Sequence, residues 1–458
     1  MSLGSAPAGR PRFGTDGVRG LANEIISPEY ALAFGRASAR VFRSTADGGP
    51  ETFFVGRDTR LSGAMIEAAL CAGLASEGAH VVRLGVCPTP AVAWLAARDG
   101  VAGVVISASH NPFQDNGIKL FAPGGLKLAN EEEQRLEDAL ATLPSSGRGS
   151  GAAIGTFLDG GSNLQEWAEA LVGSIDGRSF TGLRVVIDCG HGAAYSLAPA
   201  VLRRLGASVD ALGTDPDGIN INAGCGSTDL RPLSARVVKT GADLGLAFDG
   251  DADRVLAVDA QGQTVDGDEL IAMCAIDRKA QGRLPQDTVV VTVMANQGFR
   301  LGMAAVGILI SETAVGDRNV LERLEQGGWA LGGEQSGHVI FRELATTGDG
   351  LLTGIQVLDL MARRGMSLRS LAEQAMTRQP QVLHNVRLGA HPSLDAPELA
   401  ERLAPLAAEV QPRLQGGRVL IRPSGTEPLL RVMVEAPDRA VAERVAAELV
   451  AAAEALLR

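Results

Sequence analysis

The chain has 458 residues, of which 45% are hydrophobic and 21% charged, as in globular proteins of several domains. Its net charge of −11 argues against a nucleic-acid-binding or anionic-membrane-binding surface but allows a local basic pocket. No apolar run reaches the ~18 residues that span a bilayer, and the N-terminus lacks the apolar core of a signal peptide. We therefore expect a cytoplasmic protein without nucleic-acid or membrane partners. A monomer or homodimer is expected as well, although composition does not determine the oligomeric state.

Short apolar runs alternate with helix-like stretches, which is typical of βαβ units with mainly parallel sheets. Before residue 294, strands are predicted at Thr52–Val55, His80–Leu84, Val101–Ile106, Arg184–Asp188, Ser208–Leu212, Leu244–Phe248, Val255–Val258 and Thr288–Val293. Helices are predicted at Ser62–Glu77, Glu131–Leu143 and Ala198–Leu205. The C-terminal stretch differs, with predicted strands Val386–Leu388, Arg418–Ile421 and Leu429–Glu435 and helices Pro397–Glu409 and Arg439–Leu457. That stretch predicts a small α+β domain with antiparallel pairing.

Composition also divides the chain into domains. Leu143–Thr156 is rich in Gly and Ser, as expected of a linker, and further changes fall near Asp259–Gly267 and after Ser367–Arg378. We predict four domains, at residues 1–156, 157–260, 261–378 and 379–458. The first three are similar in length, so three related α/β units are expected.

A first candidate site is the loop SASHNP, which follows the predicted strand ending at Ile106. Pro112 bars a helix, so Ser109 and His110 should lie on a rigid loop at the carboxyl end of a strand, where open α/β sheets bind ligands. An ordinary polar turn is the alternative. A Ser-His-Asp hydrolase is a weaker one, because G-x-S-x-G is absent and neighbouring side chains on an extended loop point apart.

A second candidate is the acidic segment DGDADR, in which Asp249, Asp251 and Asp253 alternate after an apolar strand. In extended backbone the three carboxylates share one face and repel one another unless a divalent cation binds. Oxygen ligands favour Mg²⁺, Ca²⁺ or Mn²⁺ over zinc. An EF-hand is excluded because Arg254 and Ala260 stand where that loop needs Gly and Glu. A solvated acidic turn is the remaining alternative.

Three further segments combine glycine with polar side chains. RPSGTEPLLR, from Arg422 to Arg431, offers guanidinium, hydroxyl and backbone N–H groups for a phosphate, although it is no Walker loop. GGEQSGH, from Gly332 to His338, offers a carboxylate, an amide, a hydroxyl and an imidazole for sugar hydroxyls and proton transfer. FGTDGVRG offers Arg19 as an anion contact between glycines. Each segment alone is compatible with an ordinary turn.

Together and in this order, the five segments resemble the α-D-phosphohexomutase family over essentially the whole chain. The resemblance implies three related α/β domains with mixed, mainly parallel sheets and a C-terminal α+β domain around a central cleft. By the same resemblance, Ser109 is a phosphoserine and binds one Mg²⁺ together with the aspartates at 249, 251 and 253. Lys119 is similar to a general acid/base of the family, with Arg19 and His338 nearby.

The resemblance also assigns the substrate contacts. Glu334 and Ser336 face the sugar hydroxyls. The phosphate that does not react is assigned to the last segment, at Arg422, Ser424, Gly425, Thr426 and Arg431.

Details such as GCGSTD and TTGDG are similar to the glucosamine-specific branch of the family. That branch implies interconversion of glucosamine 6-phosphate and glucosamine 1-phosphate through a 1,6-bisphosphate, feeding UDP-N-acetylglucosamine synthesis. One alternative is a phosphoglucomutase or phosphomannomutase with the same mechanism. The others are a metal-dependent sugar phosphatase and a non-catalytic phosphosugar sensor, although a sensor predicts loss of Ser109 or an aspartate, and neither is lost.

Overall fold

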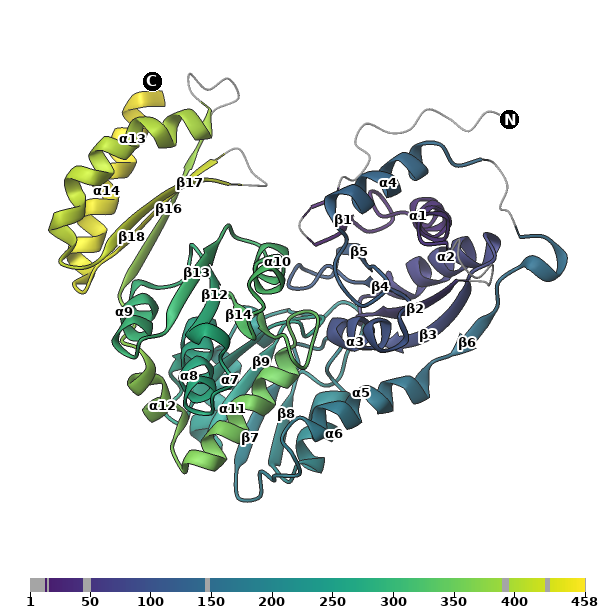
Figure 1. The fold of residues 1–458 in the computed structure, drawn as a ribbon, viewed down its shortest axis with the longest axis horizontal. Helices are drawn as coiled ribbons and strands as arrows, with labels where there is room; N and C mark the ends of the chain where they lie inside the picture. The colour runs from purple at the N-terminus through teal and green to yellow at the C-terminus, as the bar shows by residue number, and fades with distance from the viewer. Residues whose placement is uncertain are drawn as a thin grey trace. The chain divides into compact units, whose positions relative to one another are not determined.

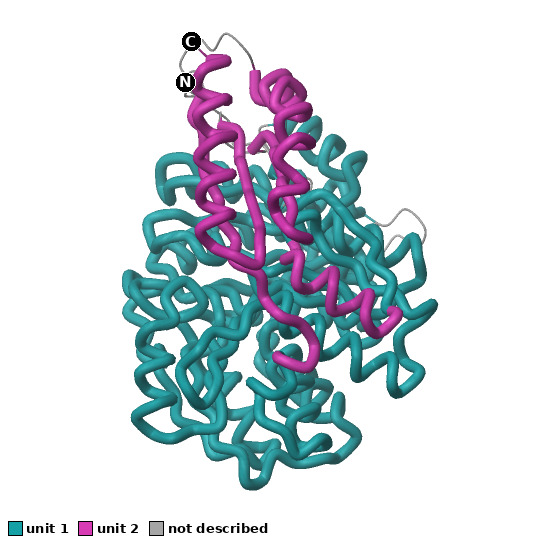
Figure 2. The backbone as a smooth tube through the Cα atoms, turned by 90° about the vertical axis from the view of Figure 1, so that its left-hand side faces the viewer, with its two compact units in different colours: residues 1–294, 308–372 teal, residues 295–307, 373–458 magenta. Residues whose placement is uncertain are grey.

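The computed structural model describes residues 13–14, 16–43, 51–144, 149–388, 395–424 and 429–457. The chain divides into two compact units, coloured separately in Figure 2. Unit 1 comprises residues 1–294 and 308–372, and unit 2 comprises residues 295–307 and 373–458.

The first sheet of unit 1 has the strand order β1-β5-β4-β2-β3-β6 (Figure 1). Its strands are β1 (Val18–Leu21), β2 (Thr52–Arg57), β3 (His80–Val86), β4 (Ala102–Ile106), β5 (Asp115–Phe121) and β6 (Phe157–Asp159). β4, β2, β3 and β6 are parallel, whereas β5 and β1 form an antiparallel edge. Every residue of β4 (AGVVI) is buried, as expected of a central strand covered on both faces. This pairing places the carboxyl ends of β2 and β4 beside the start of β5.

Two more mixed sheets complete unit 1, in the orders β11-β10-β9-β7-β8 and β13-β12-β14-β15. Their strands are β7 (Arg184–Asp188), β8 (Ser208–Leu212), β9 (Leu244–Phe248), β10 (Val255–Asp259), β11 (Thr264–Val265), β12 (Thr288–Thr292), β13 (Leu309–Thr313), β14 (Leu331–Gly333) and β15 (Val339–Phe341). In each sheet the parallel strands come first, and the last strands added pair antiparallel at one edge.

Helices pack against these sheets through apolar faces. Those of unit 1 are α1 (Pro28–Val41), α2 (Gly63–Ser76), α3 (Thr89–Asp99), α4 (Asn130–Ala141), α5 (Gly161–Gly173), α6 (Leu197–Arg204), α7 (Arg231–Thr240), α8 (Gly267–Ala280), α10 (Asp317–Gly327) and α11 (Gly350–Arg364). α1 begins at the N-cap Ser27, whose hydroxyl oxygen accepts from Tyr30 N. α8 begins with a capping box between Asp266 and Glu269. One core cluster joins α1, α2 and α4 to β2 and β4.

Unit 2 is an α+β domain built on the antiparallel sheet β16-β18-β17. Its elements are α9 (Gln297–Ala305), β16 (Gln381–Arg387), α13 (Ala396–Val410), β17 (Arg418–Pro423), β18 (Leu429–Glu435) and α14 (Arg439–Leu457); α12 (Leu368–Ala375) spans the junction of the two units. One core cluster joins the apolar residues of α13 and α14 to those of the sheet.

The predicted fold class is confirmed, with three mixed, mainly parallel sheets followed by an α+β domain. The strands predicted before Met294 lie within two residues of the observed ones. The strand predicted at Val386–Leu388 is present, but its bounds were wrong, because β16 runs from Gln381 to Arg387. Polar residues in its first half concealed that half in the sequence. The four domain limits stay a prediction. In the described part of the chain, no helix is both long enough and apolar enough to cross a bilayer.

Candidate active site

Ser109 lies in the loop between β4 and β5, at the carboxyl end of β4. Its backbone adopts a φ of 52°, a left-handed conformation that is uncommon for a residue other than glycine. The side chain is fully buried. Its hydroxyl donates to Asp249 Oδ2 at 2.5 Å, across 140 positions of sequence. The loop predicted to carry the serine therefore presents it to the predicted acidic segment.

The acidic segment follows β9, as expected, but it is a turn and not extended backbone. Ala252 has a φ of 58°, which bends the chain so that the three carboxylates converge within 4.8 Å of one another. The prediction of a shared face by a period of two was wrong, yet the prediction of a carboxylate cluster holds. Gly250 is required here, since a Cβ would lie 2.5 Å from the carbonyl oxygen of Ser109.

The carboxylate cluster has the properties of a site for a hard divalent cation. Asp249, Asp251 and Asp253 are all buried. The Oδ1 atoms of Asp251 and Asp253 have no hydrogen-bond partner among the described residues. Two buried acceptors are therefore left unsatisfied, which is uncommon in folded proteins. Burial, together with repulsion from Asp253 and Asp251, raises the pKa of Asp249 well above its usual range. A bound cation would supply the missing partners and relieve the repulsion.

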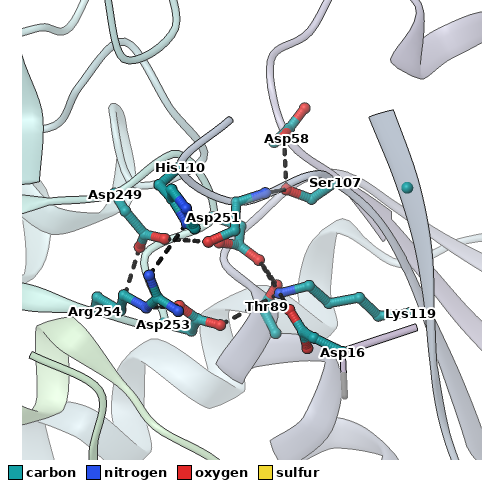
Figure 3. Close-up of polar contacts among 12 residues, drawn as sticks. Asp16, Asp58, Thr89, Ser107, His110, Lys119, Asp249, Asp251, Asp253 and Arg254 are labelled. Carbon is teal, nitrogen blue, oxygen red and sulfur yellow. Dashed lines mark hydrogen bonds and ion pairs between the residues drawn. The ribbon is translucent and has the colours of Figure 1, made fainter. Parts of the chain in front are cut away.

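Lys119 projects from β5 into the same cluster (Figure 3). Its Nζ lies 2.7 Å from Asp251 Oδ2, 3.3 Å from Asp253 Oδ2 and 2.8 Å from Asp16 Oδ2. Burial opposes the charge, but the three carboxylates outweigh it and raise the pKa of Lys119 well above its usual range. The same ammonium holds the pKa of Asp253 well below its usual range despite burial. Lys119 is therefore an ammonium in this arrangement. It can act as a general acid first, and as a general base only after it has given up a proton.

Arg19, on β1, reaches the site through Asp16. The two form an ion pair, and Lys127 Nζ lies 2.7 Å from the other carboxylate oxygen of Asp16. Burial would raise the pKa of Asp16, but Lys119, Lys127 and Arg19 together hold it well below its usual range. Asp16 thus brings three cations together around one carboxylate, a role that could not be predicted from the residues next to it in the chain.

His338 and Glu334 lie between β14 and β15, at the end of the predicted sugar segment. Gly348 N donates to His338 Nε2 at 3.0 Å, so that nitrogen is unprotonated and the Nδ1–H faces Asp253, 3.8 Å away. Glu334 Oε1 accepts from Gly316 N at 3.0 Å, and Ser336, which is exposed, lies 3.5 Å from Glu334 Oε2. His338 therefore contacts the acidic cluster, and the other two residues lie beside it in the chain.

His110, the neighbour of Ser109, does not activate that serine. Its Nδ1 lies 3.1 Å from the Arg254 guanidinium. Burial and the charges of Arg254 and Arg19 lower the pKa of His110 to about 4, so the ring is neutral near pH 7. The Ser109 hydroxyl instead donates to Asp249. The hydrolase alternative therefore lacks its nucleophile–base pair.

The predicted phosphate segment belongs to unit 2. Arg422 lies near the end of β17, directly opposite Arg431 in the register of β18, and Ser424 follows the strand. This register places the side chains of Arg422 and Arg431 on the same face of the hairpin. Gly425 and Thr426 lie outside the described residues.

Several residues of the site were missed by the sequence. Thr89, at the start of α3, donates from its hydroxyl to Asp251 Oδ2 at 2.6 Å. Asn222, the last residue of the sequence GININ (residues 218–222), donates to the carbonyl oxygen of Ser109 at 2.9 Å. Asp58 and Arg60 follow β2 and contact the serine loop. Asp58, Arg60 and Thr89 had only one signal in the sequence, their position shortly after an apolar strand, whereas Asn222 lies in the segment whose continuation, GCGSTD, carries the resemblance.

Asp349 caps α11 beside the site and predicts a dependence of stability on pH. Its Oδ1 accepts from Leu352 N at 2.9 Å, and burial raises its pKa to about 7. In the unfolded chain the Asp349 carboxyl loses its proton near pH 4, whereas the folded protein keeps it up to about pH 7. Between these pH values the folded state binds more protons than the unfolded one, so the free energy of unfolding falls as pH rises. Asn caps equally well without titrating. Asp349→Asn should remove this fall, at most about 4 kcal/mol at ~1.4 kcal/mol per pKa unit.

Urea unfolding of both proteins at several pH values measures this effect. Asp395→Asn, at the exposed N-cap of α13, controls for the change of capping group. Parallel stability curves for wild type and Asp349→Asn between pH 4 and pH 8 would contradict the prediction.

Comparison with protein families gives four matches in chain order. They are phosphoglucomutase/phosphomannomutase alpha/beta/alpha domains I (residues 10–146), II (165–262) and III (266–379), and the C-terminal domain (397–452). The chain is 51% identical to the phosphoglucosamine mutase of Symbiobacterium thermophilum over 441 residues, 95% of this chain and 97% of that protein. It is also 51% identical to the phosphoglucosamine mutase of Rhodococcus jostii, over 95% and 98% of the two chains.

Solved structures of the same architecture superpose on most of the chain. A phosphoglucomutase/phosphomannomutase family protein from Burkholderia thailandensis matches with a TM-score of 0.80 and 26% identity, over 96% of this chain and 97% of that one. The N-acetylphosphoglucosamine mutase of Aspergillus fumigatus, solved with GlcNAc-6P and magnesium, shares the fold at a TM-score of 0.68 and 17% identity, over 99% and 97%. The chain belongs to the phosphoglucomutase/phosphomannomutase family, the α-D-phosphohexomutases.

Proposed function

We propose that the chain is a phosphoglucosamine mutase, an intramolecular phosphotransferase that interconverts glucosamine 6-phosphate and glucosamine 1-phosphate. The observation that carries the proposal is the buried hydroxyl of Ser109, 2.5 Å from Asp249 of the carboxylate cluster. Identity of 51% to two phosphoglucosamine mutases over 95% of the chain supports the choice of sugar. The product would feed UDP-N-acetylglucosamine synthesis.

The metal site has a defined part in this proposal. Members of the family use Mg²⁺, and Asp249, Asp251 and Asp253 form a group able to hold one ion. We propose that a phosphate on Ser109 completes the ligand set. Mg²⁺ bound there would offset negative charge on the transferring phosphoryl group.

The chemical step is transfer of a phosphoryl group between two hydroxyl oxygens. The P–Oγ bond of phospho-Ser109 breaks, and a P–O bond forms to the free hydroxyl of the sugar phosphate, giving the 1,6-bisphosphate. Lys119, which starts as an ammonium, protonates the leaving Oγ and takes the proton of the attacking hydroxyl. After the bisphosphate turns around, its other phosphoryl group returns to Ser109 by the same step reversed. Arg19 pairs with Asp16, which contacts Lys119, and His338 lies beside Asp253. Both would keep the charged groups around Lys119 in place.

Substrate contacts are assigned to two further loops. Glu334 and Ser336 would bind the sugar hydroxyls, with the Glu334 carboxylate already oriented by Gly316 N. The phosphate that does not react would be held by the last segment, at Arg422, Ser424, Gly425, Thr426 and Arg431. Such an anion site must accept either phosphate of the bisphosphate, which suits guanidinium and hydroxyl donors.

We also propose that the protein works in the cytoplasm as a monomer or homodimer, with a small phosphosugar as its ligand. Its net charge of −11 disfavours nucleic-acid and anionic-membrane partners. Size-exclusion chromatography with light scattering measures the oligomeric state.

A substrate panel tests the function. The kcat/KM for glucosamine 6-phosphate should exceed those for glucose 6-phosphate and mannose 6-phosphate by at least roughly tenfold, because a site that hydrogen-bonds the amine rejects analogues that lack it. A preference for glucose or mannose would make the chain a phosphoglucomutase or phosphomannomutase. Release of free phosphate without isomerisation would make it a phosphatase.

A further inference from the structure

Arg60 is a fully buried arginine that contacts the serine loop along most of its length. It lies in the loop after β2, and among the described residues its guanidinium donates to Asp58, to carbonyl groups of the serine loop and to the carbonyl of the first residue of β5. The carbonyl partners are Ser109 (2.8 Å), Asn111 (2.8 Å), Asp115 (3.0 Å) and Pro112. One side chain therefore fixes three carbonyl groups between β4 and β5 and a fourth at the start of β5.

Asp58 connects the same guanidinium to the other side of Ser109. Asp58 Oδ2 accepts from Arg60 Nε at 2.8 Å. The same oxygen accepts from the Ser107 hydroxyl at 2.6 Å (Figure 3). The Ser107 oxygen in turn accepts from Ser109 N at 2.9 Å. The Ser107 hydroxyl thus holds the N–H of Ser109, and the buried Arg60–Asp58 pair, with Asn222 as a second donor, holds its C=O.

This arrangement matters because of the backbone conformation of Ser109. A φ of 52° is unfavourable for a residue with a side chain and persists only where the surroundings fix it. In this conformation the hydroxyl meets Asp249 at 2.5 Å. Relaxation toward negative φ would rotate the side chain away from the carboxylate cluster, since Cβ moves with the backbone.

We propose that Arg60 and Asp58 are positioning residues for phosphoryl transfer, which hold Ser109 in its left-handed conformation. The proposal rests on the proposed role of Ser109 as the phosphoryl carrier. Neither side chain touches the carboxylate cluster in the contacts of the described residues; both act through the loop backbone and Ser107. A lysine cannot replace Arg60, because an ammonium lacks the planar fork that reaches four carbonyls and Asp58 together.

The test compares Arg60→Lys with a matched control. Arg60→Lys keeps a cation beside Asp58 but loses most of the bonds to the loop. We expect kcat to fall roughly 10²-fold, as misplaced reacting groups do, with KM for the sugar phosphate changed less than about threefold. The control Arg40→Lys removes a comparable bidentate pair, from Arg40 to the buried Glu77, and should lower the melting temperature without lowering kcat.

A second readout follows the phosphoserine itself. Protein phosphorylated on Ser109 and freed of sugar should transfer its phosphoryl group to added glucosamine 6-phosphate more slowly in Arg60→Lys, in single-turnover measurements. Ser107→Ala, which removes the acceptor for Ser109 N with little change in volume, should slow the same step roughly tenfold. This variant also keeps the test open if an Arg60 substitution prevents folding.

The proposal fails if folded Arg60→Lys and Ser107→Ala both transfer within about twofold of wild type, or if Arg40→Lys loses as much kcat as they do. Failure of the underlying function looks different. If Ser109→Ala itself retained turnover, Ser109 would not be the carrier, whatever the Arg60 variants did. An inactive Ser109→Ala with active Arg60 and Ser107 variants would overturn the positioning role alone.

Discussion

Replacing Ser109 with alanine is expected to lower turnover by roughly 10⁴-fold or more, because the variant has no oxygen to carry the phosphoryl group. The fold should persist, since the exchange removes one buried hydroxyl that donates to Asp249. Intact-mass measurement of purified wild type should show a fraction heavier by one phosphate. Peptide mapping should locate that phosphate on Ser109, and the heavier species should be missing from the variant.

Ser174→Ala is a suitable control, because that hydroxyl donates to the Leu171 carbonyl in the turn after α5. It should keep full turnover and the same phosphorylated fraction as wild type. Near-normal activity of Ser109→Ala, or a phosphate mapped to another residue, would refute the assignment of the carrier.

Removal of divalent cations is expected to lower turnover by roughly 10³-fold, and added Mg²⁺ to restore it, since metal charge at a phosphoryl group contributes several kcal/mol. Stability should respond as well. Mg²⁺ at about 100 times its Kd should stabilise wild type by about 2.7 kcal/mol. Asp249→Asn removes one of three mutually repelling charges, so without Mg²⁺ it should melt above wild type and gain much less when Mg²⁺ is added.

The control for this experiment is Asp210→Asn, which alters a carboxylate paired with Arg236. Its melting temperature should rise with Mg²⁺ as that of wild type does. Equal Mg²⁺-induced shifts in wild type and Asp249→Asn, or full turnover after exhaustive chelation, would exclude the carboxylate cluster as the metal site.

The sequence was informative where a chemical group repeats or where a strand ends. Asp249, Asp251 and Asp253 could be predicted as one cluster because three carboxylates in five residues need a common cation. Their backbone could not, since only the structure shows the turn at Ala252 that replaces extended chain. The alternation of apolar and helical stretches sufficed for the fold class, because parallel sheets bury their strands on both faces.

Residues that act through the backbone of another segment could not be recognised from a local pattern in the sequence. Arg60 and Asp58 support a serine 49 or more positions away, and Asp16, just before β1, pairs with a lysine on β5. Their roles depend on which strand ends meet at one edge of a sheet, which is a property of the fold and not of local spacing. The antiparallel strand β5, with its polar beginning at Asp115, was likewise absent from the predicted strands, although it carries Lys119.

The partners of Lys119 have a consequence for how the protein is made. Translation delivers Asp16 before Lys119, whereas Asp251 leaves the ribosome 132 residues after that lysine. If the first sheet forms on the nascent chain, Asp16 is the only one of the three carboxylate partners already made when Lys119 is enclosed. Asp16 would then supply the first counter-charge of that ammonium and keep it in the finished fold, where the later aspartates join it.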